Sequence, residues 1–253
     1  MISNTAGTTI GTSPYDESLK RRRKGAASGL NRNAIQAYIG HLDTETRAFI
    51  AEIFVCGAGG ERDLDPLSII QRLSLSLSLT MNWGTPKLSL TSKLFEEITT
   101  VQNQISRLRS TTGNLEDYIP LLRLNPFGRR KANAESLRYR RDAFLNSLND
   151  ELDERMRQGT HQPCIRSSVI EDKDVKLDEA ELTSVSLTML SAGLNTITAV
   201  LRWSIALLAT RPDIQEAAEN AIREHYSRES PLCDVRDDQT CSYVQALVKE
   251  CLR

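Results

Sequence analysis

Residues 191–196 read Ser-Ala-Gly-Leu-Asn-Thr, and they lie within an uncharged run that extends from residue 182 to residue 201. The run is bounded by Glu181 and Arg202. Its length is enough to cross a bilayer, but it carries many Ser and Thr residues and one Asn, which a lipid-facing helix would rarely hold. A helix that is apolar on nearly all sides is otherwise a core helix. We therefore predict a buried core helix from about residue 177 to residue 210.

Helical periodicity dominates the rest of the chain and indicates a mainly α fold. Ser13-Pro14 is typical of an N-cap followed by a first helical residue. Leucines alternate like a strand within residues 66–82, although the apolar residues there also fit a helix, so periodicity leaves both open. Gly and Ala at residues 57–60 predict a helix stop, and residues 159–176 predict a loop. The predicted helices cover residues 13–31, 33–56, 92–109, 129–158, 211–226 and 241 to the last residue.

Composition excludes several classes of protein. The 253 residues have a net charge of −1, so no overall field draws the chain to nucleic acid. The five cysteines are odd in number and irregularly spaced, which favours reduced thiols over a disulfide framework. His161 and Cys164 are three residues apart, but a lone pair predicts a loop rather than a metal site. His41 and His225 lie in polar helical contexts and are expected at the surface.

Residues 192–196 combine small side chains with a hydroxyl one helical turn later. Small side chains let another group approach the backbone closely. Thr196 can donate a hydrogen bond to the carbonyl of Ala192 and bend the helix. By itself this pattern is most simply a packing notch in a buried helix.

Three further segments change that interpretation. They are the last four residues, Glu250-Cys251-Leu252-Arg253, the opening at residues 4–14, and the basic block at residues 20–24. In this order and spacing, the segments resemble cytochrome P450 monooxygenases, particularly fungal ones. Residues 191–196 then match the oxygen-activation helix, and the last four match the Glu-x-x-Arg helix.

The resemblance implies a role for each matching residue. Thr196 and Asn195 would take part in oxygen activation, although the family usually has an acid where Asn195 stands. Ala192 and Gly193 would lie near a haem. The resemblance also assigns Lys20 and Arg21 to haem propionates or the reductase, with Tyr15 in place of the usual Trp, and Glu250 and Arg253 to a structural pair.

The family's haem-ligating loop, Phe-x-x-Gly-x-x-x-Cys-x-Gly, does not occur in this sequence, so no metal ligand is assigned. Phe127-Gly128 has part of its character, but no cysteine follows. We therefore expect residues 1–253 to form one incomplete P450 domain, without the N-terminal anchor and sheet region and without the C-terminal haem-thiolate region. As written, such a chain would be cytoplasmic, would lack a transmembrane anchor, and would be inactive.

Two alternatives stay open at this point. A gene model that lost flanking exons would leave this fragment of an active microsomal P450, which binds haem, takes electrons from an NADPH-dependent reductase and hydroxylates a small organic substrate at the endoplasmic reticulum. A helical interaction protein that kept the fragment as a binding surface is the other alternative.

Overall fold

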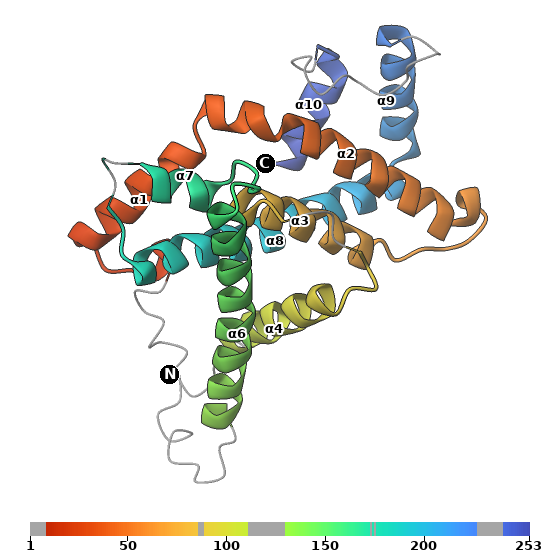
Figure 1. Ribbon diagram of the computed structural model, residues 1–253. Helices are drawn as coiled ribbons and strands as arrows, with labels where there is room; N and C mark the ends of the chain where they lie inside the picture. The colour runs from red at the N-terminus through yellow and green to blue at the C-terminus, as the bar shows by residue number, and fades with distance from the viewer. Residues whose placement is uncertain (1–8, 86–88, 111–129, 173, 175, 227–239) are drawn as a thin grey trace.

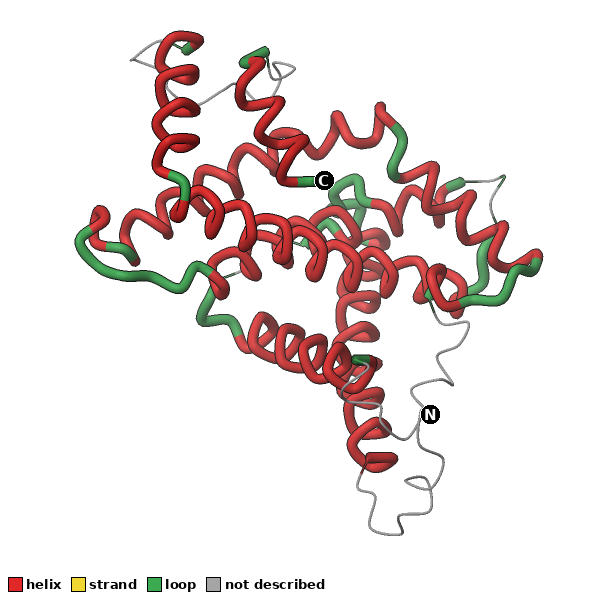
Figure 2. Tube along the Cα trace, turned by 180° about the vertical axis from the view of Figure 1, so that it is seen from behind, coloured by secondary structure: helices red, strands yellow, loops and turns green. Residues whose placement is uncertain are grey.

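The computed structural model describes residues 9–85, 89–110, 130–172, 174, 176–226 and 240–253. Every regular element in this part of the chain is a helix, so the mainly α prediction is confirmed (Figures 1 and 2). The elements are η2 (Ile10–Thr12), α1 (Glu17–Gly29), α2 (Arg32–Cys56), η3 (Ala58–Gly60), α3 (Leu67–Trp83), α4 (Lys93–Arg109), α6 (Arg130–Arg157), α7 (Ile165–Glu171), α8 (Glu179–Thr210), α9 (Pro212–His225) and α10 (Ser242–Cys251). Residues 4–8 and Phe127-Gly128, which the sequence analysis used, lie outside the described residues.

Helix α8 is the central element, and α3 packs along it more extensively than any other helix (Figure 1). Its start is fixed by a reciprocal capping box. Asp178 Oδ1 accepts from the Glu181 N–H at 2.7 Å, and Glu181 Oε2 accepts from the Asp178 N–H at 3.2 Å. These bonds satisfy backbone donors that a helix start leaves unpaired.

The ambiguous segment at residues 66–82 is helical and ends at Gly84, whose φ of 58° is left-handed. Helix α3 is buried on almost every side, so leucines and serines are both inside. Ser74 and Ser78, one turn apart, face α8: Thr198 Oγ1 donates to Ser74 Oγ at 3.3 Å. Two of the alternating serines, Ser74 and Ser78, line the contact with α8, and the segment is a helix rather than a strand.

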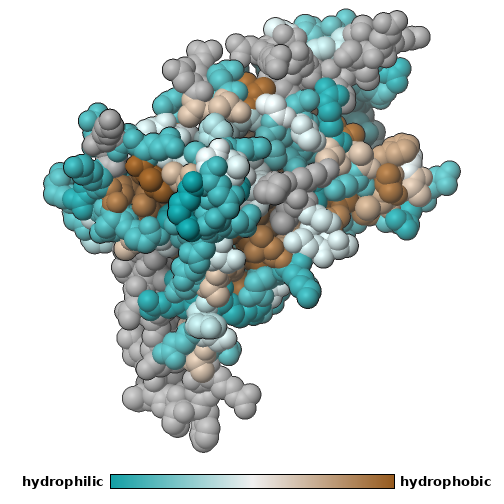
Figure 3. All heavy atoms as spheres, viewed as in Figure 1, coloured by the Kyte–Doolittle hydropathy of each residue, from teal (hydrophilic) through white to brown (hydrophobic). Residues whose placement is uncertain are grey.

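Two apolar clusters hold the helices together. The larger lies among α3, α4, α6 and the first half of α8, and it includes Trp83, Ile98, Leu145 and Leu190. The smaller joins α1, α7 and the start of α8. Outside these clusters, apolar surface gathers at the end of α2, where Ile50, Phe54 and Val55 are exposed (Figure 3).

The structure corrects two local predictions. Helix α1 begins at Glu17 with Asp16 as its N-cap, not at Ser13-Pro14, because the Asp16 carboxylate accepts from the Leu19 N–H at 2.7 Å. The predicted loop at residues 159–176 contains helix α7. Its N-cap is Cys164, a residue type that sequence rules do not associate with caps, and its side chain accepts from the Ser167 N–H.

The prediction of a buried core helix holds for only half of α8. Residues Leu182, Val185, Leu190 and Leu194 are buried, whereas Trp203 is 76% exposed and Leu207 is 39% exposed. Among the described residues, α8 is the one helix whose length and composition would suffice to cross a membrane, and a third of that apolar stretch is buried inside the protein. Its first half is part of the protein core.

Helices α2 and α3 enclose an ion-pair cluster. Arg72 Nη1 donates to Glu45 Oε2 at 2.5 Å, and Arg72 Nε donates to Glu52 Oε2 at 2.6 Å. The side chains of Arg72 and Glu45 are fully buried. A buried pair of this kind depends on both partners, because removing one leaves an uncompensated charge.

We predict that Arg72→Met lowers the free energy of unfolding by about 3–5 kcal/mol, since Glu45 would keep a buried negative charge without its cation. Arg47→Met is the matched control on α2. Arg47 pairs with Asp43 at 2.9 Å, but both side chains are exposed, so its loss should cost about 1 kcal/mol or less. Urea unfolding of both variants measures the difference, and equal midpoints would contradict the prediction.

Candidate active site

The residues that the sequence analysis assigned to oxygen activation lie where α8 passes from its buried half to its exposed half. Ala192, Asn195, Thr196 and Ala199 are exposed and follow helical spacing, so they form one stripe along α8. Leu190 and Leu194 lie on the opposite side, in the larger apolar cluster. We call these four exposed residues the α8 stripe. It presents small and polar side chains on an otherwise apolar helix.

Within the stripe, the Thr196 hydroxyl is bonded back to its own helix. Thr196 Oγ1 donates to the Ala192 carbonyl at 2.6 Å. The hydroxyl keeps its lone pairs, so it can still accept a hydrogen bond from outside the helix. The Asn195 amide is exposed and makes no hydrogen bond to the described residues. Thr196 and Asn195 therefore offer two adjacent polar groups on an open face.

Gly193 belongs to a different face of α8. A Cβ atom at this position would lie 2.3 Å from Ser78 Oγ on α3, which is closer than van der Waals contact allows. The Ser78 hydroxyl is itself held, because it donates to the Ser74 carbonyl at 2.8 Å. A side chain at residue 193 would therefore have to displace the Ser78 hydroxyl from this bond. Ala192, its neighbour, is the small residue that faces outward.

Helix α4 reaches α8 directly beside the stripe. The Gln102 side chain is 2% exposed, and its Nε2 donates to Ser191 Oγ at 3.2 Å. Ser191 precedes Asn195 by one helical turn, so this bond fixes α4 against α8 next to the candidate site. The sequence analysis did not select Gln102, since a Gln in an amphipathic helix carries no signal of its partner.

The predicted basic residues of α1 lie at the beginning of α8. Arg21 Nη2 donates to Glu181 Oε1 at 2.5 Å, and Ser18 Oγ donates to the same oxygen at 2.6 Å. Burial would raise the pKa of Glu181, but the hydrogen bonds from Ser18, Arg21 and the backbone outweigh it and lower this pKa. Lys20 instead pairs with exposed Glu17 at 2.6 Å and lies over the Tyr15 ring at 5.4 Å. Arg21 thus ties α1 to α8, whereas Lys20 stays on the surface.

The predicted pair at the end of the sequence forms, but it is exposed. Arg253 Nη1 lies 3.5 Å from Glu250 Oε1, with side chains 81% and 67% exposed. Helix α10 ends at Cys251, so Arg253 lies just past it. An exposed pair with this separation contributes little to stability.

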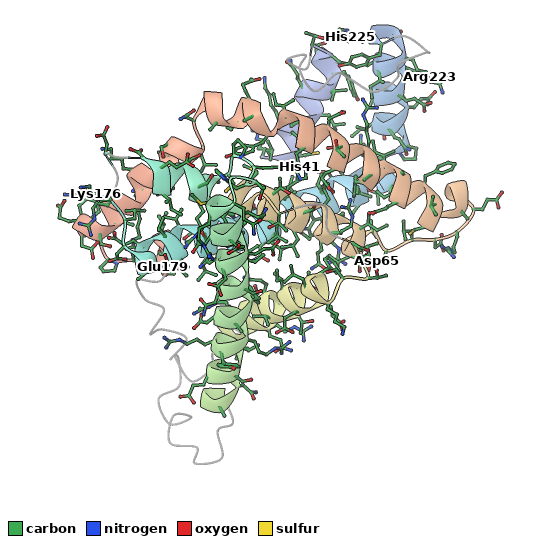
Figure 4. All side chains as sticks on the ribbon, in the orientation of Figure 1. His41, Asp65, Lys176, Glu179, Arg223 and His225 are labelled. Atoms are coloured by element: carbon green, nitrogen blue, oxygen red, sulfur yellow. The ribbon has the colours of Figure 1, made fainter. Side chains whose placement is uncertain are left out.

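The described cysteines and histidines offer no metal site. Cys56, Cys164, Cys241 and Cys251 are free thiols, and no group of three or more Cys, His, Asp or Glu side chains gathers within the described residues. His225 is exposed as predicted, and its Nε2 lies 2.6 Å from Thr240 Oγ1. His41, which Figure 4 labels, is only partly exposed, because its Nε2 is buried.

Comparison with known proteins identifies the family to which this chain belongs. The sequence model described as "Cytochrome P450" matches residues 5–253, so the chain belongs to the cytochrome P450 family. The chain is 61% identical to 3-hydroxyphenylacetate 6-hydroxylase and 41% identical to phenylacetate 2-hydroxylase, both of Emericella nidulans, over its whole length. It covers 49% of each relative, which is about half of their length.

A solved structure agrees with this assignment at the level of fold. The crystal structure of a cytochrome P450 (CYP102L1) matches with a TM-score of 0.74 at 16% sequence identity. The match covers 99% of this chain and 56% of that one. The helical arrangement is therefore a partial P450 fold, and the recognition as a P450 of fungal type is confirmed.

The close contact between Gly193 and Ser78 gives a direct test of how α8 packs against α3. We predict that Gly193→Ala lowers the free energy of unfolding by about 1–3 kcal/mol, because the new methyl group must displace the Ser78 hydroxyl from its bond to the Ser74 carbonyl. In the double variant with Ser78→Ala, the added Cβ would meet only the residue 78 Cβ, at 3.5 Å, which is ordinary contact. The double variant should therefore recover most of the loss. Chemical denaturation of the two single variants and the double variant measures the coupling, and strict additivity would contradict it.

Proposed function

We propose that these residues form the oxygen-activating helical part of a fungal P450 that hydroxylates an aromatic acid of the phenylacetate type. The observation that carries the proposal is the α8 stripe, with Thr196 bonded back to Ala192 beside Asn195. The substrate class rests on the two Emericella relatives, whose names specify hydroxylation of phenylacetate and of 3-hydroxyphenylacetate.

The α8 stripe fits one face of a haem. A flat macrocycle needs small side chains on the helix that covers it, and Ala192 and Ala199 meet this requirement. Gly193 lies beside the stripe and lets α8 pack closely on α3. When bound through a thiolate, a haem supplies the activation of dioxygen for oxygen insertion. None of the five cysteines stands in the family's ligand loop, so the thiolate is not assigned to any of them.

The chain's own contribution is to hold and move protons. The Asn195 amide can hold a water molecule but does not titrate, so it cannot act as the acid that the family usually has at this position. Thr196 Oγ1 can accept a hydrogen bond from that water while donating to the Ala192 carbonyl. We infer that a proton from solvent passes along water to the Thr196 hydroxyl.

By the family resemblance, an NADPH-dependent P450 reductase supplies electrons, and the natural protein works at the endoplasmic reticulum membrane. The exposed cations of α1 are the surface that we assign to the reductase. Lys20 is part of this surface, while Arg21 is shared with Glu181. Arg21 therefore serves the α1–α8 contact first and a partner or a haem propionate second.

We predict that Thr196→Val, in the natural protein supplied with reductase and 3-hydroxyphenylacetate, yields more hydrogen peroxide and less hydroxylated product per NADPH. The valine keeps the shape of the threonine but has no hydroxyl to pass a proton. Asn195→Asp should be tolerated, because an acid is usual there. Thr210→Val, at the far end of the same helix, is the control and should leave the ratio unchanged.

The two parts of the proposal fail separately in this experiment. If the unaltered protein hydroxylates no arylacetic acid, the substrate class is wrong. If it does so and Thr196→Val leaves the yield per NADPH unchanged, the assignment of the α8 stripe is wrong.

We also predict that residues 1–253, expressed alone and mixed with haem, give no thiolate-haem spectrum, and that the isolated segment is therefore inactive as a hydroxylase. The reason is that the family's cysteine loop is not part of these residues. The measurement is a difference spectrum, the reduced CO-treated sample minus the reduced sample. A Soret band at the P450 position that disappears when one of the five cysteines is changed to Ser would overturn this prediction.

A further inference from the structure

Helix α4 buries an amide beside the residues that join it to the apolar core. Ile98 and Val101 of α4 lie in the larger apolar cluster, together with Leu190 and Leu194 of α8. Gln102, which follows Val101, is also buried, with 2% of its surface exposed. Burying an amide costs free energy unless the amide is hydrogen-bonded, and a leucine at this position would avoid that cost. The amide therefore needs a partner inside the protein.

The partner of this amide is the Ser191 hydroxyl of α8. Gln102 Nε2 donates to Ser191 Oγ at 3.2 Å, and Ser191 Oγ lies 3.4 Å from Gln102 Oε1. A hydroxyl can both donate and accept, so the two side chains are bonded whichever way round the amide is placed. The bond ties α4 to α8 at a defined point along both helices.

Ser191 differs in this respect from other hydroxyls of α8. Thr188, Thr196 and Ser204 each donate to the carbonyl four residues earlier in the same helix. This local bond is a common one for a hydroxyl inside a helix. Ser191 instead directs its hydroxyl towards α4. Its side chain therefore serves the contact between two helices and does not merely pair with its own backbone.

The position of Ser191 places this bond beside the α8 stripe. Successive residues of a helix are about 100° apart, so Ser191 and Gly193 project on either side of Ala192. Gly193 packs closely against Ser78 of α3, whereas Ser191 bonds to α4. The α8 stripe begins at Ala192 and opens between these two contacts. Helix α3 holds one side of this turn of α8, and Gln102 holds the other.

We propose that Gln102 is a positioning residue for the α8 stripe. Its bond to Ser191 sets the rotation of the turn of α8 that leads to Asn195 and Thr196. Gln102 is buried and acts through Ser191, so it is not itself a catalytic residue. Its effect on oxygen chemistry rests on the proposed function of the α8 stripe. Its effect on the position of α8 does not, because that depends only on the contact between α4 and α8.

Loss of the bond should disturb the proton path while the core stays packed. In Gln102→Leu the new side chain fills a similar volume, so α4 keeps its place in the apolar cluster. The Ser191 hydroxyl can then bond back to its own helix, and α8 is free to turn slightly. A misplacement of about 1 Å in an active site can lower a rate by about 100-fold. The Thr196 hydroxyl is the group that such a turn would move.

The first test is hydrogen exchange of the natural protein, with its full chain and haem, read by mass spectrometry. Gln102→Leu and Ser191→Ala should each speed exchange in residues 191–199, because this part of α8 opens more often. Ser191→Thr keeps the hydroxyl and should exchange like the unaltered protein. The double variant of Gln102→Leu with Ser191→Ala should exchange no faster than either single variant, because the same bond is lost only once.

The second test is the yield of hydroxylated product per NADPH, with reductase and 3-hydroxyphenylacetate. Gln102→Leu and Ser191→Ala should both form less product and more hydrogen peroxide, with KM little changed, because the proton path rather than substrate binding is disturbed. Ser191→Thr should keep the yield of the unaltered protein.

Asn149→Leu is the matched control for lost stability. Asn149 is buried, and its Oδ1 accepts from Trp83 Nε1 at 2.8 Å, so its replacement also removes a buried hydrogen bond between helices. Its contact with α8 is at Thr183, about two turns before Ser191. Asn149→Leu should lower the melting temperature but leave the exchange of residues 191–199 and the yield per NADPH unchanged.

Three results would overturn the proposal. They are unchanged exchange in residues 191–199, an unchanged yield in both Gln102→Leu and Ser191→Ala, and equal changes in Asn149→Leu. The last would show that lost stability, and not lost position, is the cause. An unaltered protein that hydroxylates no arylacetic acid would count against the proposed substrate class instead, and the exchange measurement, which needs no substrate, would still decide whether Gln102 positions α8.

Discussion

The contact between α3 and α8 is the constraint on which the rest of the structure depends. Gly193 has no room for a side chain against Ser78, and Thr198 lies over Ser74 one turn further on. Small residues on both helices let the two backbones approach closely, so the position and rotation of α8 against α3 are fixed. The direction in which the α8 stripe faces follows from this rotation. Gly193 faces α3, whereas Ala192, about 100° further round the helix, lies outside this contact and is exposed.

Polar contacts then fix the ends of this central pair. Glu181 at the beginning of α8 is both part of the capping box and the acceptor for Ser18 and Arg21 of α1. Gln102 of α4 reaches Ser191 near the middle of the same helix. A single long helix thereby orients α1 and α4.

Much of the fold follows from the sequence, because strong periodicity and helix breakers decide most of the helices. Thr196 and Ala192 were selected as candidates because their pattern is a known one, and the predicted hydrogen bond from the Thr196 hydroxyl to the Ala192 carbonyl is present. Sequence did not reveal α7, since its cap is a cysteine. It also placed His41 at the surface, because the polarity of its neighbours gives no sign that they are buried with it.

Residue 193 shows where reasoning from a motif and reasoning from packing diverge. The motif assigns Ala192 and Gly193 to one role, as two small residues beside a haem. The structure separates them: Ala192 is exposed on the α8 stripe, whereas Gly193 packs closely against Ser78 of α3. The motif therefore contains two requirements at adjacent positions, an open outer face and a close inner contact. If α8 serves the proposed function, a substitution at either position would act for a different reason: at residue 192 by filling the open face, and at residue 193 by disturbing the contact with α3.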